Sequence, residues 1–252
     1  MAAGRYTPDR DAAGLATPFD RDASFVLVDG IALRGGYAGI GSPNPDARDV
    51  AAYVTVLSGD LRGNDVGGYP NSDNSRHIVS ALGVGACTVL EGVTVAGAYA
   101  HATAPDVLSR SGGGIYSSNA SLRIERCVFR GCYASWYGGA VYHSGAGTIT
   151  IVSCYFEQNT SDRGGAVFVG ESAQAEVRHC TIVRNFASDR GGGLHLGGGD
   201  GGGIGLELHL LGESTLLRCL HSHAGGADFR GDGRRSDGGP LLRPGVDGSA
   251  GG

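Results

Sequence analysis

Short hydrophobic and polar runs recur at a fixed spacing through the middle of this chain. An aliphatic residue follows a run of glycine and alanine at steps of 26, 26 and 27 residues: Ile115, Val141, Val167 and Leu194. Cysteine recurs at steps of 27 and 26 residues: Cys127, Cys154 and Cys180. Because self-similarity with a period of roughly 20–50 residues is the signature of a solenoid, we expect stacked structural repeats here.

Each repeat contains stretches of β-forming residues separated by turn-forming residues. In one repeat, 139–143 and 148–152 are such stretches, and glycine and serine dominate between them. No repeat holds an apolar run with helical periodicity that is long enough for a helix. A unit of this kind fits one coil of a parallel β-helix, in which each coil hydrogen-bonds to the next at about 4.8 Å.

The alignment of the repeats also predicts which side chains face the core. Five and three positions before each cysteine, and two positions after it, the residues are apolar in all three repeats: Leu122, Ile149 and Ala175; Ile124, Ile151 and Val177; Phe129, Phe156 and Ile182. The residues between them are polar or mixed, including Arg126, Ser153 and His179 directly before the cysteines. We therefore expect inside and outside to alternate along each strand, with a bend of the chain near the cysteine.

The earlier part of the chain fits the same scheme less regularly. Strands are expected at 25–28, 31–33 and 53–57, and a long polar loop at 59–76, which is either functional or disordered. The segment 88–95 rejoins the repeat, with Val93 in the cysteine column and Val95 in the phenylalanine column. The step from 93 to 127 is 34 residues, so about eight extra residues are expected within 100–111.

Two short motifs accompany this period. Gly-Gly-Ala-Val stands at 164–167 and Phe-Glu-Gln-Asn at 156–159, with a variant at 182–185 and a departure at Cys132, where asparagine is expected. The pair resembles the repeat of polymorphic outer membrane proteins, within the wider right-handed parallel β-helix, or pectin-lyase-like, group. The resemblance covers about 90–196 and implies an all-β fold, a right-handed parallel β-helix solenoid. It also implies secretion, surface display and adhesion.

Three segments follow from these patterns. Residues 1–22 are expected to be a disordered lead-in, and 23–196 the β-helix, with its clearest coils at 90–196. Residues 197–252 read as a glycine-rich, partly disordered tail in which 214–219 is a candidate degenerate last coil.

Composition and charge narrow the range of partners. Glycine is extreme at 47 of 252 residues, and the formal net charge is −5 without a basic cluster, which argues against a nucleic-acid partner. No apolar run is long enough to cross a membrane, and the first twenty residues lack the hydrophobic region of a signal peptide. Because the resemblance implies export, we expect the export signal upstream of this start; a cytoplasmic chain is the alternative.

The six cysteines fit neither a zinc pattern nor a C-x-x-C motif. Those of the repeated column are expected to form a ladder of buried thiols that act as small hydrophobes. A disulfide between stacked coils is the alternative. Cys87, Cys132 and Cys219 have no evident partner.

Two sets of repeated residues are candidates for ligand binding. The first follows the aliphatic column and would form an outward stack beneath sugar rings: Tyr116, Tyr142, Phe168 and His195. The alternatives are an inward orientation, or a stack that only stabilises coil pairing. The second is Arg163 and Arg190, each in a Ser-Asp-Arg triplet, which could clamp the carboxylates or sulfates of an acidic glycan. Local Asp–Arg pairing is the alternative there.

No catalytic residue, metal ligand set or cofactor is predicted. The acids Glu125, Glu157 and Glu176 fall in different columns, whereas a glycoside hydrolase needs two carboxylates that flank one bond. The motifs of polygalacturonase-like and pectate-lyase-like members are absent, and calcium would enter only for a lyase. We therefore expect an interaction module that binds polysaccharides or cell-surface glycans without catalysis. A polysaccharide lyase or hydrolase, or a structural fragment of a larger surface protein, are the alternatives.

Overall fold

The computed structural model describes residues 1–9, 15, 17–66, 70, 72–103, 106–170 and 172–197, and nearly all of its regular structure is parallel β-sheet. Four sheets run along the molecule, and each takes the name of its first strand here. The β1 sheet contains β1 (Gly4–Tyr6), β4 (Thr55–Ser58), β7 (Thr94–Ala96), β11 (Val128–Arg130), β15 (Tyr155–Glu157) and β19 (Thr181–Val183). The β2 sheet contains β2 (Phe25–Val26), β5 (Val79–Leu82), β9 (Ile115–Ser118), β13 (Val141–Ser144), β17 (Val167–Val169) and β21 (Leu194–Leu196).

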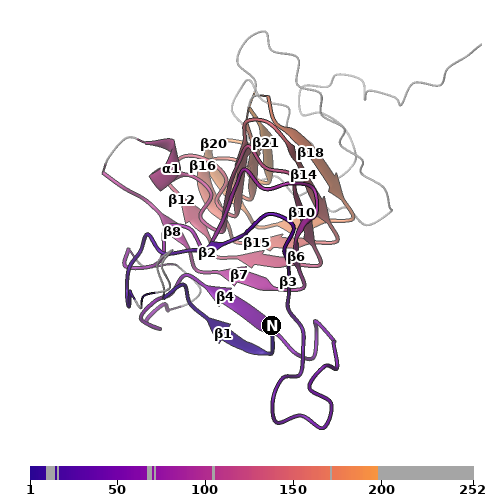
Figure 1. The fold of residues 1–252 in the computed structure, drawn as a ribbon. Helices are drawn as coiled ribbons and strands as arrows, with labels where there is room; N and C mark the ends of the chain where they lie inside the picture. Colours follow the sequence, from indigo (N-terminus) through magenta and orange to yellow (C-terminus); the bar gives the residue numbers. More distant parts are fainter. Residues whose placement is uncertain are drawn as a thin grey trace, which may run out of the picture.

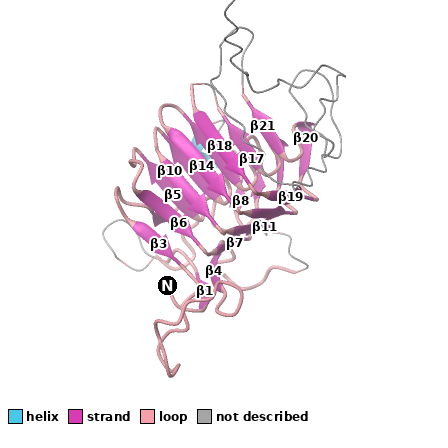
Figure 2. Ribbon diagram, turned by 90° about the vertical axis from the view of Figure 1, so that its right-hand side faces the viewer, coloured by secondary structure: helices cyan, strands magenta, loops and turns pink. Residues whose placement is uncertain are grey.

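The other two sheets complete each coil. The β3 sheet contains β3 (Ala32–Arg34), β6 (Thr88–Glu91), β10 (Leu122–Glu125), β14 (Thr148–Val152) and β18 (Gln174–Arg178). The β8 sheet contains β8 (Tyr99–Ala100), β12 (Tyr133–Ala134), β16 (Thr160–Arg163) and β20 (Phe186–Arg190). The coils stack from the N-terminal strands to β18, β20 and β21 (Figure 1), and Figure 2 shows β6, β10, β14 and β18 side by side.

The pairing register follows the period of the sequence. Val141 is opposite Ile115 on one side and Val167 on the other, and Val167 is opposite Leu194. The same holds upstream, where Phe129 pairs with Val95. From β9 onward, each coil of 26 or 27 residues therefore adds one strand to every sheet, as the sequence predicts, and the expected all-β parallel β-helix is confirmed.

The core consists of the columns predicted to face inward. Ile124, Ile151 and Phe156 have no exposed surface, and their neighbours Arg123 and Thr150 are only partly buried. Phe129 and Phe156 stack with ring centroids 4.8 Å apart and an interplanar angle of 6°. Apolar side chains of consecutive coils thus pack directly on one another along the inside of the solenoid.

The bend before each cysteine has a left-handed backbone. Arg126, Ser153 and His179 have φ values of 51°, 54° and 53°. This conformation is unfavourable for residues other than glycine, asparagine and aspartate. Its repetition on three coils confirms the predicted bend and joins the β3 sheet to the β1 sheet at a sharp angle.

The cysteine column is a ladder of buried free thiols, as expected. Cys127, Cys154 and Cys180 are buried and unbridged, and so is Cys132. The Cys154 thiol donates to the carbonyl oxygen of Val152 at 3.3 Å, and burial raises its pKa well above the ordinary value. Cys87 is free and exposed, whereas Cys219 lies outside the described residues.

The asparagines of the repeated motif form a second buried ladder. Asn159 is fully buried; its Oδ1 accepts from the backbone N–H of Cys132 at 3.1 Å, and its Nδ2 donates to the carbonyl of Phe129 at 3.0 Å. Asn185 repeats the pattern one coil later, since its Oδ1 accepts from the backbone N–H of Asn159 at 2.9 Å. Cys132 ends the ladder because it offers a backbone N–H but no side-chain amide.

The structure also describes the start of the chain and most of the extra residues within 100–111. The expectation of disorder over 1–22 is wrong for its first part, because Gly4–Tyr6 form β1 and pair in parallel with β4. The extra residues expected within 100–111 include the short helix α1 (Val107–Arg110), which Asp106 caps by accepting from the backbone N–H of Ser109. Residues 198–252, which include nearly all of the predicted glycine-rich tail and the degenerate last coil at 214–219, lie outside the described residues. The division into domains stays a prediction.

Candidate functional site

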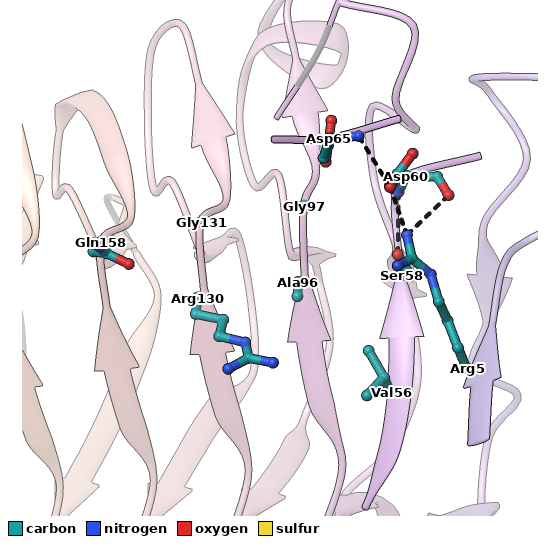
Figure 3. A pocket seen from close by; sticks show the side chains of 10 residues that line it. All are labelled: Arg5, Val56, Ser58, Asp60, Asp65, Ala96, Gly97, Arg130, Gly131 and Gln158. Atoms are coloured by element: carbon teal, nitrogen blue, oxygen red, sulfur yellow. Dashed lines mark hydrogen bonds and ion pairs between the residues drawn. The ribbon is translucent and has the colours of Figure 1, made fainter. Parts of the chain in front are cut away.

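A groove of about 380 Å³ lies on the outer face of the β1 sheet, near its N-terminal end (Figure 3). It is lined by strands of four coils and by the start of the polar loop at 59–76. The lining residues are Arg5, Val56, Ser58, Asp60, Asp65, Ala96, Gly97, Arg130, Gly131 and Gln158.

Strand alternation puts these side chains outside. Ser58, Ala96 and Arg130 occupy one row of the sheet, while the inward positions beside them, such as Phe129, are fully buried. The Arg130 side chain extends from β11 toward the small Ala96 side chain on β7 (Figure 3). The floor of the groove is thus backbone and small side chains, and its walls carry the charges.

Arg5 and Asp60 form the ion pair at one end of the groove. An amino group of Arg5 lies 2.7 Å from Oδ2 of Asp60 and 3.2 Å from its carbonyl oxygen. Asp60 also accepts from the backbone N–H of Asn64 at 3.0 Å. Partial burial alone would raise the pKa of Asp60, but the hydrogen bonds from Arg5, Asn64 and Asp65 together with the charge of Arg5 outweigh it and hold the pKa below its usual value. Asp60 is therefore an ionised anchor of the loop at neutral pH.

Asp65 is tied down in a similar way. Its Oδ2 accepts from Nδ2 of Asn74 at 2.7 Å, and the same nitrogen donates to the carbonyl of Gly97 at 2.7 Å. Asn74 is fully buried, so the bond fixes both ends of the loop against the coil that contains β7. The loop that the sequence marks as functional or disordered thus supplies two ordered carboxylates to the groove.

Arg130 and Gln158 present the polar groups that are accessible to a ligand. Both side chains are exposed, and within the described part of the chain no ion pair involves Arg130. Tyr155 projects from the same outer face, on the strand next to Arg130, and is 36% exposed. A guanidinium, an amide and an aromatic ring on one rigid face can hold a polar ligand by hydrogen bonds and ring contact.

The predicted aromatic column exists, but its rings face one another. Tyr116, Tyr142, Phe168 and His195 stack in this order, with centroid distances of 5.2, 5.6 and 5.3 Å. Tyr142, Phe168 and His195 are each only 7% exposed. Tyr137 packs over the column, with its ring 4.5 Å from that of Phe168. This geometry favours a ladder that stabilises coil pairing, and a role in sugar binding stays a prediction.

His195 at the end of this column is strongly perturbed. Burial, followed by the positive charges of Arg163 and Arg190, lowers the pKa of His195 to about 4. The imidazole is therefore neutral at physiological pH and stacks as an ordinary aromatic ring on Phe168.

Arg163 and Arg190 are opposite each other across β16 and β20, as the repeat predicts. Asp189 lies between them, 2.7 Å from Nε of Arg163 and 3.6 Å from Nε of Arg190. Ser188 donates to the carboxylate of Asp162 at 2.6 Å. The geometry supports the local-pairing alternative, and anion binding by these arginines stays a prediction.

The three outward acids do not converge. Glu125 pairs with Arg123, Glu157 with Arg184 and Glu176 with Arg178. Across the described ranges, no group of three histidine, cysteine, aspartate or glutamate residues is arranged to hold a metal ion. The groove itself combines the hydrogen-bonded carboxylates of Asp60 and Asp65 with two guanidiniums, of which that of Arg5 is paired with Asp60.

The fixed positions of the repeat motifs do not mark the groove residues, since Arg130 and Gln158 stand at variable positions between the phenylalanine and the asparagine or Cys132. Arg5 and Asp60 lie outside the regular coils, and Arg130 is one of many arginines in the chain. The feature of the sequence that indicated this site is the polar loop at 59–76, whose residues Asp60 and Asp65 line the groove. Gly97 and Gly131 also line the groove and add no side chain to it.

Comparison with protein-family models identifies the fold family of the chain. A family model described as a right-handed beta helix region matches residues 71–210. No curated protein and no solved structure matches the chain. Among the described residues, no helix has the length and apolar character needed to span a membrane.

Proposed function

Because this chain belongs to the right-handed β-helix family, whose members share a scaffold rather than one activity, we propose that it is an interaction module that binds a glycan without catalysis. The site is the groove on the outer face of the β1 sheet. The module acts outside the cell, as a secreted or surface-attached protein, in keeping with the polymorphic outer membrane protein-type motifs at 156–159 and 164–167.

One observation carries this proposal: the groove's acids are bound internally, whereas its exposed donors point outward. Asp60 is bonded to Arg5 and Asp65 to Asn74. A catalytic acid must be protonated near neutral pH, yet the pKa of Asp60 is lowered. Arg130 and Gln158 can donate to the hydroxyl, carboxylate or sulfate oxygens of a sugar chain without losing an internal partner.

Binding to an extended chain also fits the geometry. The lining of the groove runs from β1 across β4, β7 and β11 to Gln158, which directly follows β15. Adjacent strands are about 4.8 Å apart, so this span is on the order of 15–20 Å along the solenoid. An oligosaccharide fits such a length better than a single sugar does.

The test is to measure retention and product release for polygalacturonate, heparin and a neutral xylan, each with and without calcium. Retention in affinity electrophoresis without new chain ends is the expected result. Arg130→Ala should weaken binding by about tenfold, because a charge-assisted hydrogen bond is lost. Arg178→Ala is the matched control, since it removes an equal charge from the β3 sheet, and it should bind as the wild type does.

Two outcomes would replace the proposal. Release of product would favour a polysaccharide lyase or hydrolase, for which the presence of Asp60 and Asp65 in the groove is the supporting observation. Failure to retain any of the three polysaccharides would favour a structural role within a larger surface protein.

A further inference from the structure

The outer face of the β8 sheet carries an aromatic column with one rung missing. Tyr99 is opposite Tyr133, Tyr133 is opposite Thr160, and Thr160 is opposite Phe186. Four consecutive coils thus present Tyr, Tyr, Thr and Phe at the same position. The third coil has a small hydroxyl side chain where the column otherwise has a ring.

Complete ladders in this molecule define the spacing of the rungs. Tyr99 and Tyr133 stack at 4.8 Å, as do Phe129 and Phe156 in the core. Because one coil advances about 4.8 Å, Phe186 is about 9.6 Å from Tyr133 along the solenoid. This distance leaves room for one ring, since stacked rings pack with centroids about 4.5–7 Å apart.

The column faces solvent. Its inward neighbours on the same strands are small and buried: Ala100, Ala134, Ser161 and Ala187. Phe186 is 52% exposed, which is unusual for a large apolar ring on a regular strand, and Tyr133 is half-buried with one ring face on Tyr99. The slot between Tyr133 and Phe186, with Thr160 at its base, is therefore open on the outer side of β12, β16 and β20, which lie side by side in Figure 1.

Polar groups line one side of the slot. Asp162 is two residues beyond Thr160 and is partly exposed on the same outward side. One of its carboxylate oxygens accepts from Ser188 at 2.6 Å, which holds the group in place. The Thr160 hydroxyl at the base can donate or accept. An apolar ring would contact only the Tyr133 and Phe186 rings, whereas a ring with hydroxyls on its edge would also form hydrogen bonds with Thr160 and Asp162.

We propose that the slot binds one pyranose ring of a neutral, glucose-type β-linked glycan, sandwiched between Tyr133 and Phe186. A pyranose with equatorial substituents presents C–H groups on both faces and hydroxyls around its edge. Its faces therefore pack on the two aromatic rings, and its edge hydroxyls bond to Thr160 and Asp162. The slot is a site distinct from the groove on the β1 sheet and does not depend on it.

Filling the missing rung tests the proposal. Thr160→Tyr completes the ladder, so the melting temperature should stay the same or rise, while binding of cellohexaose should fall by about tenfold or more. Phe186→Ala removes one wall and should weaken binding similarly. Thr150→Tyr is the matched control, because Thr150 is an outward threonine on β14 in the β3 sheet. Titration calorimetry measures the affinity, and the fluorescence of Trp136, the single tryptophan and three residues after Tyr133, gives a second readout.

The outcomes separate cleanly. Loss of cellohexaose binding in Thr160→Tyr and Phe186→Ala, with binding kept in Thr150→Tyr, supports the slot. Unchanged binding in Thr160→Tyr overturns it, as does failure of the wild-type protein to bind cellohexaose. Loss of cellohexaose binding in Arg130→Ala alone assigns that ligand to the groove and also overturns the slot.

Discussion

The residues at the left-handed bends show how position overrides residue preference in this protein. Arg126, Ser153 and His179 share φ values between 51° and 54°, although each pays about 1 kcal/mol or more for this conformation. The strands before and after each bend are hydrogen-bonded into the β3 and β1 sheets. This pairing fixes the direction in which the chain enters and leaves the bend. The side chains at the bend are exposed, so their chemistry is free to vary from coil to coil.

The alternation of inward and outward residues leads to a direct test in β14. Ile151 is fully buried and Thr150 next to it faces outward. Ile151→Asp should lower the free energy of unfolding by about 4 kcal/mol or more, because it removes a buried apolar side chain and puts an unpaired carboxylate in the core. Urea unfolding followed by circular dichroism measures the change. Thr150→Asp should shift stability by less than about 1 kcal/mol, and equal effects of the two substitutions would contradict the assignment.

His195 predicts a pH dependence of stability. Its pKa is lowered from 6.5 to about 4 in the folded protein, mainly by burial and then by Arg163 and Arg190. The unfolded chain therefore binds a proton that the folded chain does not bind between these two pKa values. Stability is fully present above about pH 6.5 and is lost as the pH falls toward 4.

We expect this residue to cost about 1–2 kcal/mol of stability between roughly pH 7 and pH 5. Unfolding measured at both values in the wild type and in His195→Phe isolates the effect, because a phenylalanine keeps the stack on Phe168 and does not titrate. The other histidines contribute equally to both proteins. An identical loss of stability in the variant would show that His195 is not the group responsible.

Some residue roles follow from the sequence and others do not, for a physical reason. The core positions of Ile124, Ile151 and Phe156 were predictable because burial in a solenoid depends on position within the repeat. The ion pair of Arg5 and Asp60 was not, because it joins residues 55 apart in sequence, outside the repeated coils. The sequence left the orientation of Tyr142 and Phe168 open between an outward stack and an inward or coil-stabilising one, since their burial depends on where the Tyr137 ring packs.

Among the elements, the asparagine ladder explains why a motif of this type recurs. Each asparagine satisfies backbone groups at the bend between the β1 and β8 sheets, where the strand hydrogen bonds are interrupted. Asn159 bonds to the backbone of Cys132 and Phe129, one coil earlier. Buried backbone groups without partners are costly, so a short polar side chain at this point is part of the fold rather than of a binding site.

Removing one rung of this ladder gives a second stability test. Asn159→Ala leaves the N–H of Cys132 and the carbonyl of Phe129 without these partners, and we expect a loss of about 3 kcal/mol. Gln174→Ala on β18 in the β3 sheet is the control, because Gln174 is exposed, and it should change stability by less than about 1 kcal/mol. Equal values for both variants in urea unfolding would mean that water replaces the asparagine amide at this bend.

The aromatic columns differ in function according to what lies next to them. The column of Tyr116, Tyr142, Phe168 and His195 is continuous and covered by Tyr137, so its ring faces are used inside the protein. The column of Tyr99, Tyr133 and Phe186 is interrupted and faces outward, so two ring faces remain for a ligand. A sequence repeat reveals both columns equally, but only the packing around them separates a structural ladder from a binding slot.

At the scale of the whole molecule, the right-handed β-helix provides long flat faces on which sites are set by a few outward residues. The period of the sequence determines the stacking, and hence the order of strands in all four sheets. It carries less information about outward side chains, which vary between coils. Both proposed sites lie where the repeat is broken: the groove beside the loop at 59–76, and the slot where Thr160 replaces a ring.

The neighbour-only contacts of a solenoid lead to a last prediction, on the C-terminal side. Each coil contacts the coils directly before and after it, so the stability of the described coils depends on few residues outside them. A chain of residues 1–197 should keep its circular dichroism spectrum and melt within a few degrees of the full chain, which thermal unfolding of both proteins would measure. The slot should survive as well, because Phe186 and its pairing partner Thr160 precede the cut. A large fall in melting temperature would instead show that residues 198–252 cover the open edge of β20 and β21, as the ends of solenoids commonly require.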